Sequence, residues 1–540
     1  MIRNPILPGF NPDPSICRVG EEYFIATSTF EWFPGVQIHR SRDLVNWSLA
    51  CRPLNRASQL DMRGNPDSGG VWAPCLSHAD GLFWLVYTDV KRLDGNFKDT
   101  HNYVVTAPSV EGPWSDPIFI NSKGFDPSLF HDDDGRRYVL NLQWKHLSGS
   151  VGGAPKHPAF DGIYLQEWTP EHGLFGPVTL LTKGSALGLT EGPHLYKRGG
   201  WYYLTVAEGG TGYRHAVTML RSRDIRGPYE MHPDVHMITS KDAPEAELQR
   251  AGHGQIVETP EGLTYHTHLC SRPLKGLAER KSPLGRETAI QKCVWRDDWL
   301  YVEGGPVPSV DVPAPVEAEP QAPRALRRVF DDEVLPEEFQ WLRTPYPERL
   351  FKLTGQALRL TGRESIGSWY EQALVARRQE HLAYRAETVV ERFAPETYQQ
   401  AAGLATYYNR HKFHLACVTT MDDGTGPGVR CLTILSCPGD YPDGRMQFPC
   451  DPVPIPEGPV ALAVAVDHAR QQFLYDTGDG WQPLGPELDA SVISDEGGRG
   501  EHGSFTGAFV GMLAFDTSGM GMTADFTRFD YVPAGGREEA

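Results

Sequence analysis

Three acidic residues stand in similar short motifs that lie far apart in the chain. They are Asp13 in NPDPS, Asp126 in GFDPS and Glu191 in TEGPH. Two carboxyl groups on either side of a glycosidic bond are the minimal equipment for its hydrolysis, because one protonates the leaving oxygen and the other activates water or attacks directly. The alternative for each acid taken alone is a carboxylate that caps a turn.

The side chains suggest how the work would be divided. Glu191 has the longest side chain of the three and best reaches a leaving oxygen as general acid. Asp13 lies between two prolines, which we expect to hold it in an extended conformation with little backbone freedom, as suits a fixed general base. Asp126 would be the third carboxylate, which raises the pKa of Glu191 by like charge and orients the sugar.

An internal repeat offers a way to bring these acids together. Five stretches share a small or proline corner, a short apolar segment, a glycine-containing turn and a strand rich in aromatic and β-branched residues. Their corners are Pro14, Pro74, Pro127, Pro193 and Gly254, at steps of 60, 53, 66 and 61 residues. A period near 60 fits a four-stranded sheet with its loops, so the repeat predicts a five-bladed β-propeller, with tandem β-sandwiches as the alternative.

The propeller would make sequence distance irrelevant at its centre. The first strand of every blade lines the central channel, so the five corners meet around one axis. They carry Asp13, Trp72 with Ala73, Asp126, Glu191 and His253. Ionisable groups that converge in this way are costly to bury and usually mark function.

The rest of the chain predicts a second β domain. We expect an all-β protein, with a catalytic five-bladed β-propeller over residues 1–303, a proline-rich linker over 304–326 that acts as a spacer or as a strap, and a jelly-roll, concanavalin-like β-sandwich over 327–540. The turn DTGDG, residues 476–480, should join two strands of this sandwich as a hairpin.

Composition narrows the class of partner. The 540 residues carry 51 Lys and Arg against 69 Asp and Glu, a formal charge of -18, which disfavours nucleic acid and anionic membranes and suits a neutral ligand. The first residues lack the apolar core of a signal peptide, and the nine cysteines lack paired spacing. We therefore expect a cytoplasmic protein with free thiols.

Candidate sugar-binding residues surround the acids. Sugar sites use aromatic faces for the C–H surface of the ring and polar groups for its hydroxyls. Phe30, Trp72 and Trp144 end strand patterns and are the predicted walls, with core packing as the alternative for each. Arg286 would hydrogen-bond sugar hydroxyls or pair with Asp13, unless it forms a surface salt bridge.

The motifs resemble one known family. NPDPS, ATSTFEWFPGVQIHRSRDLVNW, VWAP, GFDPSLF, LTEGPHLY, GHGQIV and LGRETAIQ, in this order, are similar to the β-xylosidase branch of glycoside hydrolase family 43. The resemblance spans the whole chain. It implies a five-bladed propeller, inverting hydrolysis by a single displacement, and the same trio with Asp13 as base, Asp126 as pKa modulator and Glu191 as acid.

The resemblance also implies features that the residues alone do not. His253 would stand at the propeller centre as a polar anchor; a Ca²⁺ ion nearby is compatible with the family, but no metal is required, because one imidazole is a poor calcium site. The C-terminal domain would send one aromatic side chain into the pocket, for which turn-adjacent Phe505 is preferred over Phe509. Relatives are often dimers or tetramers, so a homo-oligomer is expected.

The predicted function is an exo-acting β-1,4-xylosidase that releases xylose from the non-reducing ends of xylooligosaccharides, with a side activity on α-L-arabinofuranosides. The alternatives are an α-L-arabinofuranosidase as the main activity, a retaining fructan-cleaving propeller and a non-catalytic sugar-binding propeller. The fructan enzymes carry NDPNG and RDP where this chain has NPDPS and FDP. A sugar-binding propeller should repeat one site in each blade, whereas these corners differ.

Overall fold

The computed structural model describes residues 1–95, 97–145, 159–322, 324–421, 428–498 and 504–534. The predicted all-β class is confirmed, since the helical segments in these ranges are two 3₁₀ turns, η1 (Pro347–Arg349) and η2 (Ala490–Val492). The chain forms two compact units. The first comprises Met1–Leu60, Gly69–Arg272 and Arg286–Pro320, and the second comprises Asp61–Ser68, Pro273–Gly285 and Gln321–Ala540.

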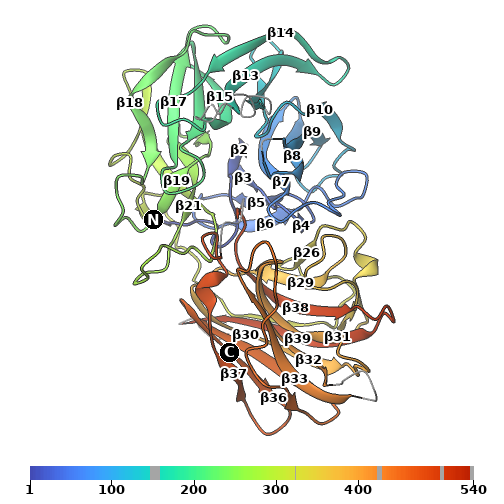
Figure 1. Ribbon diagram of the computed structural model, residues 1–540. Helices are drawn as coiled ribbons and strands as arrows, with labels where there is room; N and C mark the ends of the chain where they lie inside the picture. The colour runs from blue at the N-terminus through green and yellow to red at the C-terminus, as the bar shows by residue number, and fades with distance from the viewer. Residues whose placement is uncertain (96, 146–158, 323, 422–427, 499–503, 535–540) are drawn as a thin grey trace, which may run out of the picture. The chain divides into compact units, whose positions relative to one another are not determined.

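The first unit is the predicted five-bladed propeller. Figure 1 shows five antiparallel sheets around a common centre, each built from one contiguous stretch of chain with its first strand innermost. The strands of the five blades in turn are β2 (Ser15–Val19), β3 (Glu22–Thr27), β5 (Gln37–Ser41) and β6 (Ser48–Cys51); β7 (Gly70–Ala79), β8 (Leu82–Arg92), β9 (Asp99–Ala107) and β10 (Ile118–Asn121); β11 (Ser128–His131), β12 (Arg137–Trp144), β13 (Phe160–Thr169) and β14 (Gly173–Thr182); β15 (Glu191–Arg198), β16 (Trp201–Glu208), β17 (Ala216–Ser222) and β18 (Glu230–Thr239); and β19 (Gln249–Gly252), β20 (Ile256–Glu258), β21 (Thr264–Ser271), β22 (Glu287–Arg296) and β23 (Trp299–Val302). A short β4 (Trp32–Phe33) follows β3 along the chain but is not a strand of the first blade's sheet.

The propeller buries its apolar residues between neighbouring blades. Ile16 and Ile25 of the first blade pack in one cluster with Val257, Tyr265 and Ile290 of the fifth. Similar clusters join the second blade to the third and the fourth to the fifth. These layers exclude water between the sheets and leave the innermost strand ends free to carry polar side chains.

The two ends of the propeller sequence meet beside the fifth blade. Leu7 and Thr288 exchange two backbone hydrogen bonds of 3.2 Å each, and β1 (Ile2–Arg3) pairs with β24 (Asp311–Val312). The β24 strand belongs to the proline-rich segment, which is therefore a strap along the first unit in this part, as one of the two predicted alternatives has it. Val312 of this strand is buried.

The second unit is the predicted β-sandwich. One sheet has the order β27-β28-β39-β30-β35-β36-β37, with β25 also on β39, and the other contains β34-β33-β32-β31-β38-β29-β26. The strands of the first sheet are β25 (Leu326–Val329), β27 (Phe351–Leu353), β28 (Leu358–Thr361), β30 (Ala383–Arg392), β35 (Val460–Asp467), β36 (Arg470–Asp476), β37 (Gln482–Asp489) and β39 (Thr523–Pro533), and those of the second are β26 (Gln340–Leu342), β29 (Ala373–Arg378), β31 (Gln400–Asn409), β32 (Lys412–Met421), β33 (Val429–Pro438), β34 (Val453–Pro454) and β38 (Phe509–Asp516).

Alternation along the strands produces the sandwich core. In β30 the residues Tyr384, Ala386, Thr388 and Val390 are buried while their neighbours are partly exposed, as a strand with one face toward a core requires. The predicted hairpin at 476–480 joins β36 to β37, and Asp476 Oδ1 accepts hydrogen bonds from the N–H groups of Gly478 and Gly480 at 2.6 and 3.0 Å.

Each compact unit is assembled from separate stretches of the sequence, whereas the predicted domains are contiguous ranges. Asp61–Ser68 and Pro273–Gly285 come from the propeller part of the sequence but belong to the second unit. Arg343 Nη2 donates to Asp67 Oδ1 at 2.7 Å, and Ala508 N–H donates to the Pro283 carbonyl at 2.8 Å. Residues 535–540 of the predicted sandwich domain lie outside the described residues. Of the described helical segments, neither is long and apolar enough to span a membrane.

Candidate active site

The five corners are irregular points of the innermost strands. Asp13 and Asp126 precede β2 and β11, a bulge in β15 follows Glu191, and His253 separates β19 from β20. The expectation that Asp13 is extended is wrong, because its φ is +57°, and Asp126 has a φ of +54°. Aspartate tolerates this left-handed region better than most residues, and such strain persists only where the surroundings hold it in place.

The Asp13 carboxylate is held on both oxygens. Arg286 Nη1 donates to Oδ1 at 2.9 Å, and the Ser28 hydroxyl donates to Oδ2 at 2.7 Å. The N–H of Ser28 also bonds the Pro12 carbonyl at 3.1 Å, which ties the two loops together. Both side chains of this ion pair are about 5 % exposed, so the carboxylate is oriented and largely removed from solvent.

Arg286 also contacts the side chains of Thr211 and Phe30. Its Nη1 also lies 3.1 Å from the Thr211 hydroxyl oxygen, and its guanidinium carbon lies 5.2 Å from the centre of the Phe30 ring. Of the predicted alternatives for Arg286, the structure contains the pair with Asp13 and not a surface salt bridge. The sequence analysis did not single out Ser28, which lies within the quoted stretch ATSTFEW, or Thr211, which lies in a loop outside the quoted motifs.

Glu191 and Asp126 are joined through one backbone group. The N–H of Gly192, the residue after Glu191, donates to Asp126 Oδ2 at 3.1 Å. Burial and the charge of Asp13 raise the pKa of Glu191 to about 8. Burial, the charge of Glu191 and that of Asp13 raise the pKa of Asp126 well above its usual range. The structure therefore brings the three predicted acids together, and Glu191 keeps its proton near neutral pH.

His253 lies at the centre, as predicted, among other buried imidazoles. Its Nδ1 is 3.7 Å from Asp13 Oδ1, and its ring centre is 6.1 Å from that of His194. Burial lowers the pKa of both histidines, so both are neutral. A side chain at Gly192 would lie 2.9 Å from the His253 ring, so only glycine allows this approach.

The surroundings of His253 do not fit calcium. Calcium prefers six to eight oxygen ligands, whereas His194 offers an imidazole and Arg286 a cation, and the Asp13 oxygens are already bonded. Among the residues that the structure describes, no group of three or more His, Cys, Asp or Glu side chains could hold a metal ion. We derive no chemical step through a metal.

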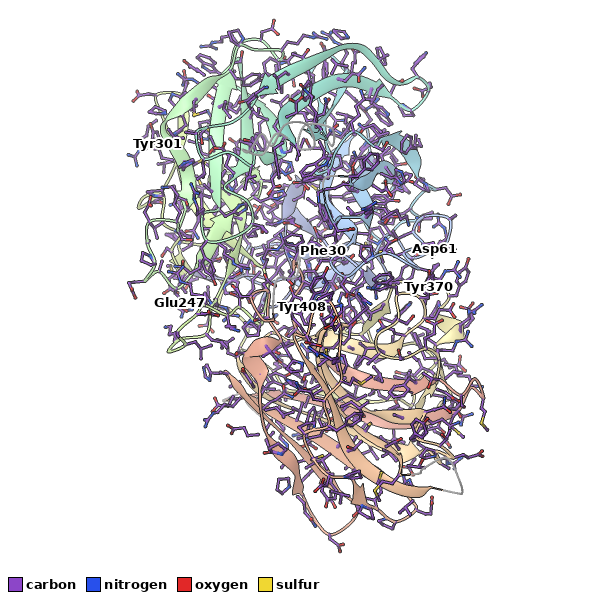
Figure 2. The ribbon with its side chains drawn as sticks, in the orientation of Figure 1. Phe30, Asp61, Glu247, Tyr301, Tyr370 and Tyr408 are labelled. Carbon is purple, nitrogen blue, oxygen red and sulfur yellow. The ribbon has the colours of Figure 1, made fainter. Side chains whose placement is uncertain are left out.

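The three predicted aromatic walls belong to one row of rings. Phe30 lies 6.2 Å from Trp72, Trp72 lies 5.2 Å from Phe125, and Phe125 lies 6.0 Å from Trp144, measured between ring centres. Phe125, which the sequence analysis did not single out, directly precedes Asp126. Its ring contacts both Trp72 and Trp144 and so connects them. Figure 2 labels Phe30 within the propeller. Its φ of +51° is held by two hydrogen bonds to the Val71 backbone.

One predicted residue belongs to the second unit. Phe505 is half-buried, and its N–H donates to the Ser68 hydroxyl oxygen at 3.0 Å. Phe509 begins β38 and is fully buried, as expected of a core residue. That Phe505 contributes to the sugar site stays a prediction.

The arrangement in the propeller has the parts of an acid–base site for a neutral ligand. It combines a carboxylate fixed by an arginine and a serine, a carboxyl group that keeps its proton near neutral pH, and a row of aromatic rings beside them. Such a pair can activate a water molecule and protonate a leaving oxygen.

Comparisons with known proteins agree with this chemistry. The profile of "Glycosyl hydrolases family 43" matches residues 2–300, and that of "Beta xylosidase C-terminal Concanavalin A-like domain" matches residues 327–532. The chain is 56% identical to the Xylosidase/arabinosidase 43B of Humicola insolens, over 98% of each chain. It is 43% identical to a Xylan 1,3-beta-xylosidase of Vibrio sp, over 98% of this chain and 99% of the relative. The crystal structure of a xylan beta-1,4-xylosidase from Bacillus halodurans matches with a TM-score of 0.92 at 47% identity and covers 98% of this chain and 100% of its own.

Proposed function

Because this chain belongs to glycosyl hydrolase family 43, and so is a glycosidase that acts on glycans, we propose that it is an exo-acting, inverting β-xylosidase. Its substrates would be β-1,4-xylooligosaccharides, from which it releases xylose at the non-reducing end. The observation that carries the proposal is that two neighbouring carboxyl groups have different electrostatic surroundings. Asp13 is paired with Arg286, while the pKa of Glu191 is raised to about 8.

The proposed reaction uses these two states directly. Glu191 gives its proton to the glycosidic oxygen as the bond from that oxygen to the anomeric carbon breaks. Asp13 accepts a proton from a water molecule whose oxygen bonds to the anomeric carbon from the opposite face. Asp13 then holds a proton and Glu191 a charge, and exchange with solvent restores both groups. The product sugar has the inverted configuration.

Asp126 would act on the general acid Glu191 through the backbone N–H of the next residue, Gly192. Its contact with the N–H of Gly192 fixes the residue next to Glu191, and its own raised pKa couples its proton to that of Glu191. This supports the proposed role of Asp126 as orienter and pKa modulator. Phe30, Trp72 and Trp144 would face the apolar side of the sugar, and Arg286 would hold Asp13 in place while its other donors meet hydroxyl groups.

The proposed sugar and the proposed linkage are inferred from the names of similar proteins. Similar proteins are named for xylosidase and arabinosidase activity and, in one case, for xylan 1,3-beta-xylosidase activity. The Humicola relative is named for both xylosidase and arabinosidase activity, which favours α-L-arabinofuranosidase as the second candidate activity of this chain. We also propose a homo-oligomer, a dimer or a tetramer, which light scattering coupled to gel filtration would test.

The decisive experiment follows the first product by proton NMR during hydrolysis of xylobiose. We expect α-xylose to appear first and to mutarotate later. Initial β-xylose would mean retention and would overturn the role of Asp13 as base. A lack of xylobiose cleavage, with rapid cleavage of an α-L-arabinofuranoside, would favour the second candidate.

The Glu191→Gln variant tests the acid. An aryl xyloside with an acidic leaving group, such as 4-nitrophenyl β-D-xyloside, needs little protonation, so this variant should retain much of its activity there. On xylobiose it should lose about 10²–10⁴-fold in kcat. Equal losses on the two substrates would exclude Glu191 as the acid.

A further inference from the structure

A buried carboxylate outside the catalytic trio lies in the same blade as Glu191. Glu208 is the last residue of β16 and is completely buried. The ionisable group beside it is His236, whose Nδ1 is 4.0 Å from Glu208 Oε2 and whose pKa is lowered by burial. No lysine or arginine among the described residues pairs with this buried acid, so its hydrogen bonds must carry its stabilisation.

The contacts of Glu208 Oε1 come from the loop that precedes Glu191, and that of Oε2 comes from β17. Glu208 Oε1 accepts from the N–H of Ser185 at 2.6 Å and lies 3.1 Å from the Thr190 hydroxyl, while Oε2 accepts from the Thr218 hydroxyl at 2.5 Å. A Cβ at Gly184 would stand 2.0 Å from the Thr190 hydroxyl and 2.2 Å from Glu208 Oε1. The segment 183–190 therefore wraps closely around this one carboxylate.

The same loop leads directly into Glu191, the first residue of β15. Thr190, which also lies 3.0 Å from the Lys183 carbonyl through its hydroxyl, is the residue before it. Glu191 pairs with Ala207, the neighbour of Glu208, and Gly209 N–H donates to the Gly188 carbonyl at 2.8 Å. Both sides of Glu208 in the chain are thus fastened to the loop or to Glu191.

We propose that Glu208 is a positioning residue for Glu191, because its carboxylate holds the loop 183–190 and the start of β15 in one geometry. This inference rests on the proposed function, in which Glu191 is the general acid. Glu208 does not act on substrate itself. It sets the place from which the acid side chain extends.

The proposal separates two classes of substrate. A displaced acid harms a reaction only where the leaving oxygen must be protonated, so the rate on xylobiose should depend on Glu208 and that on 4-nitrophenyl β-D-xyloside should not. In Glu208→Gln an amide N–H₂ replaces one carboxylate oxygen and opposes the donors of Ser185, Thr190 or Thr218. We expect kcat on xylobiose to fall by about tenfold or more, kcat on the aryl xyloside by less than about threefold, and KM to change little.

The matched control replaces another buried carboxylate, which follows β11 and hydrogen-bonds to the same two strands, β15 and β16. Asp132 accepts from Lys197 of β15 at 2.7 Å and from Tyr202 of β16 at 2.8 Å, at the ends of these strands away from Glu191. Asp132→Asn should change both rates by the same factor. Equal factors for Glu208→Gln as well would overturn the proposal.

A second pair of variants keeps the test decisive if Glu208→Gln does not fold. Thr190→Val removes the hydroxyl next to the acid, and Thr190→Ser keeps it. The valine variant should show the substrate-dependent loss and the serine variant should not; the same ratio of rates in both would contradict the proposal. The proposed function fails separately, if the wild type does not cleave xylobiose or if Glu191→Gln lacks the dependence on the leaving group.

Discussion

The core of the sandwich and the centre of the propeller bury opposite kinds of side chain. The sandwich core is a continuous apolar cluster from both sheets, with Leu404, Leu432, Leu462 and Phe526 among its fully buried members. The centre of the propeller buries carboxylates, imidazoles and a guanidinium, and its apolar residues lie between the blades. The sandwich is built as a core that stabilises, whereas the propeller centre accepts buried charge.

This difference indicates what each region is for. Apolar burial lowers the free energy of folding roughly in proportion to area, and it needs no specific partner. Buried charge stabilises only with matched hydrogen bonds and commonly marks a functional site. Changes at the propeller centre should therefore affect catalysis first, and changes in the sandwich core should affect stability first.

The largest expected effect comes from Asp13→Asn. The amide cannot accept a proton from water, so kcat should fall by about 10²–10⁴-fold on xylobiose and on 4-nitrophenyl β-D-xyloside alike. Steady-state kinetics on both substrates measures this. A loss confined to xylobiose would instead identify Asp13 as an acid.

Its control is a buried carboxylate of the sandwich. Asp525 accepts two hydrogen bonds from Arg359, at 2.6 and 2.7 Å. Asp525→Asn should lower Tm and leave kcat within about twofold of the wild type, because surface-proximal ion pairs act on stability rather than on the reaction. A fall in kcat comparable to that of Asp13→Asn would break the contrast between the two regions.

A smaller effect is expected from two adjacent residues of β30. Val390 is fully buried in the sandwich core, and Val389 points to the other face of the strand and is partly exposed. Val390→Ala should lower the free energy of unfolding by about 2–4 kcal/mol, and Val389→Ala by less than about 1 kcal/mol. Denaturant unfolding measures both, and equal losses would show that alternation does not define this core.

The smallest effect reverses the usual direction, since Glu191→Gln should stabilise the protein at alkaline pH. The pKa of Glu191 is about 8 in the folded protein, while glutamate in an unfolded chain titrates near about 4.3. Between these values the folded state binds more protons than the unfolded state, so the stability contribution of this group is lost as pH rises. Glutamine does not titrate and avoids that loss.

Differential scanning calorimetry across pH tests this sign. At pH 8 the variant should melt about 2–4 °C above the wild type, and the difference should shrink toward pH 5. A difference that grows as pH falls would contradict the raised pKa. The result would also place Glu191 among catalytic groups that are kept at a cost in stability.

The sequence predicts the parts of the molecule that repeat. The five corners and the alternation of the strands are periodic, so they indicate the propeller, the sandwich and the meeting of Asp13, Asp126 and Glu191. The pairing of Arg286 with Asp13 is one of the alternatives that the sequence predicts for this arginine. The propeller and the sandwich follow from these periodic patterns, which can be read along the chain before any contact is known.

Other features depend on contacts that no window contains. Ser28 holds Asp13 from a loop of ordinary composition, and Phe125 completes the aromatic row only after the blades close. The positive φ of Asp13 runs against the preference of a residue before proline and is kept by its partners. The assignment of Asp61–Ser68 to the second unit likewise depends on residues almost 300 positions away.

The join between the first and fifth blades has one more consequence. Asn11 N–H bonds the Arg286 carbonyl at 3.0 Å, and the Thr288 hydroxyl bonds the Asn11 carbonyl at 2.6 Å, so the backbone on either side of the Asp13–Arg286 pair is itself the join. Opening the ring at this place would separate Asp13 from Arg286 before any blade loses its own strands. Turnover is therefore a direct gauge of ring closure, and inactivation by heat should run ahead of the loss of β structure.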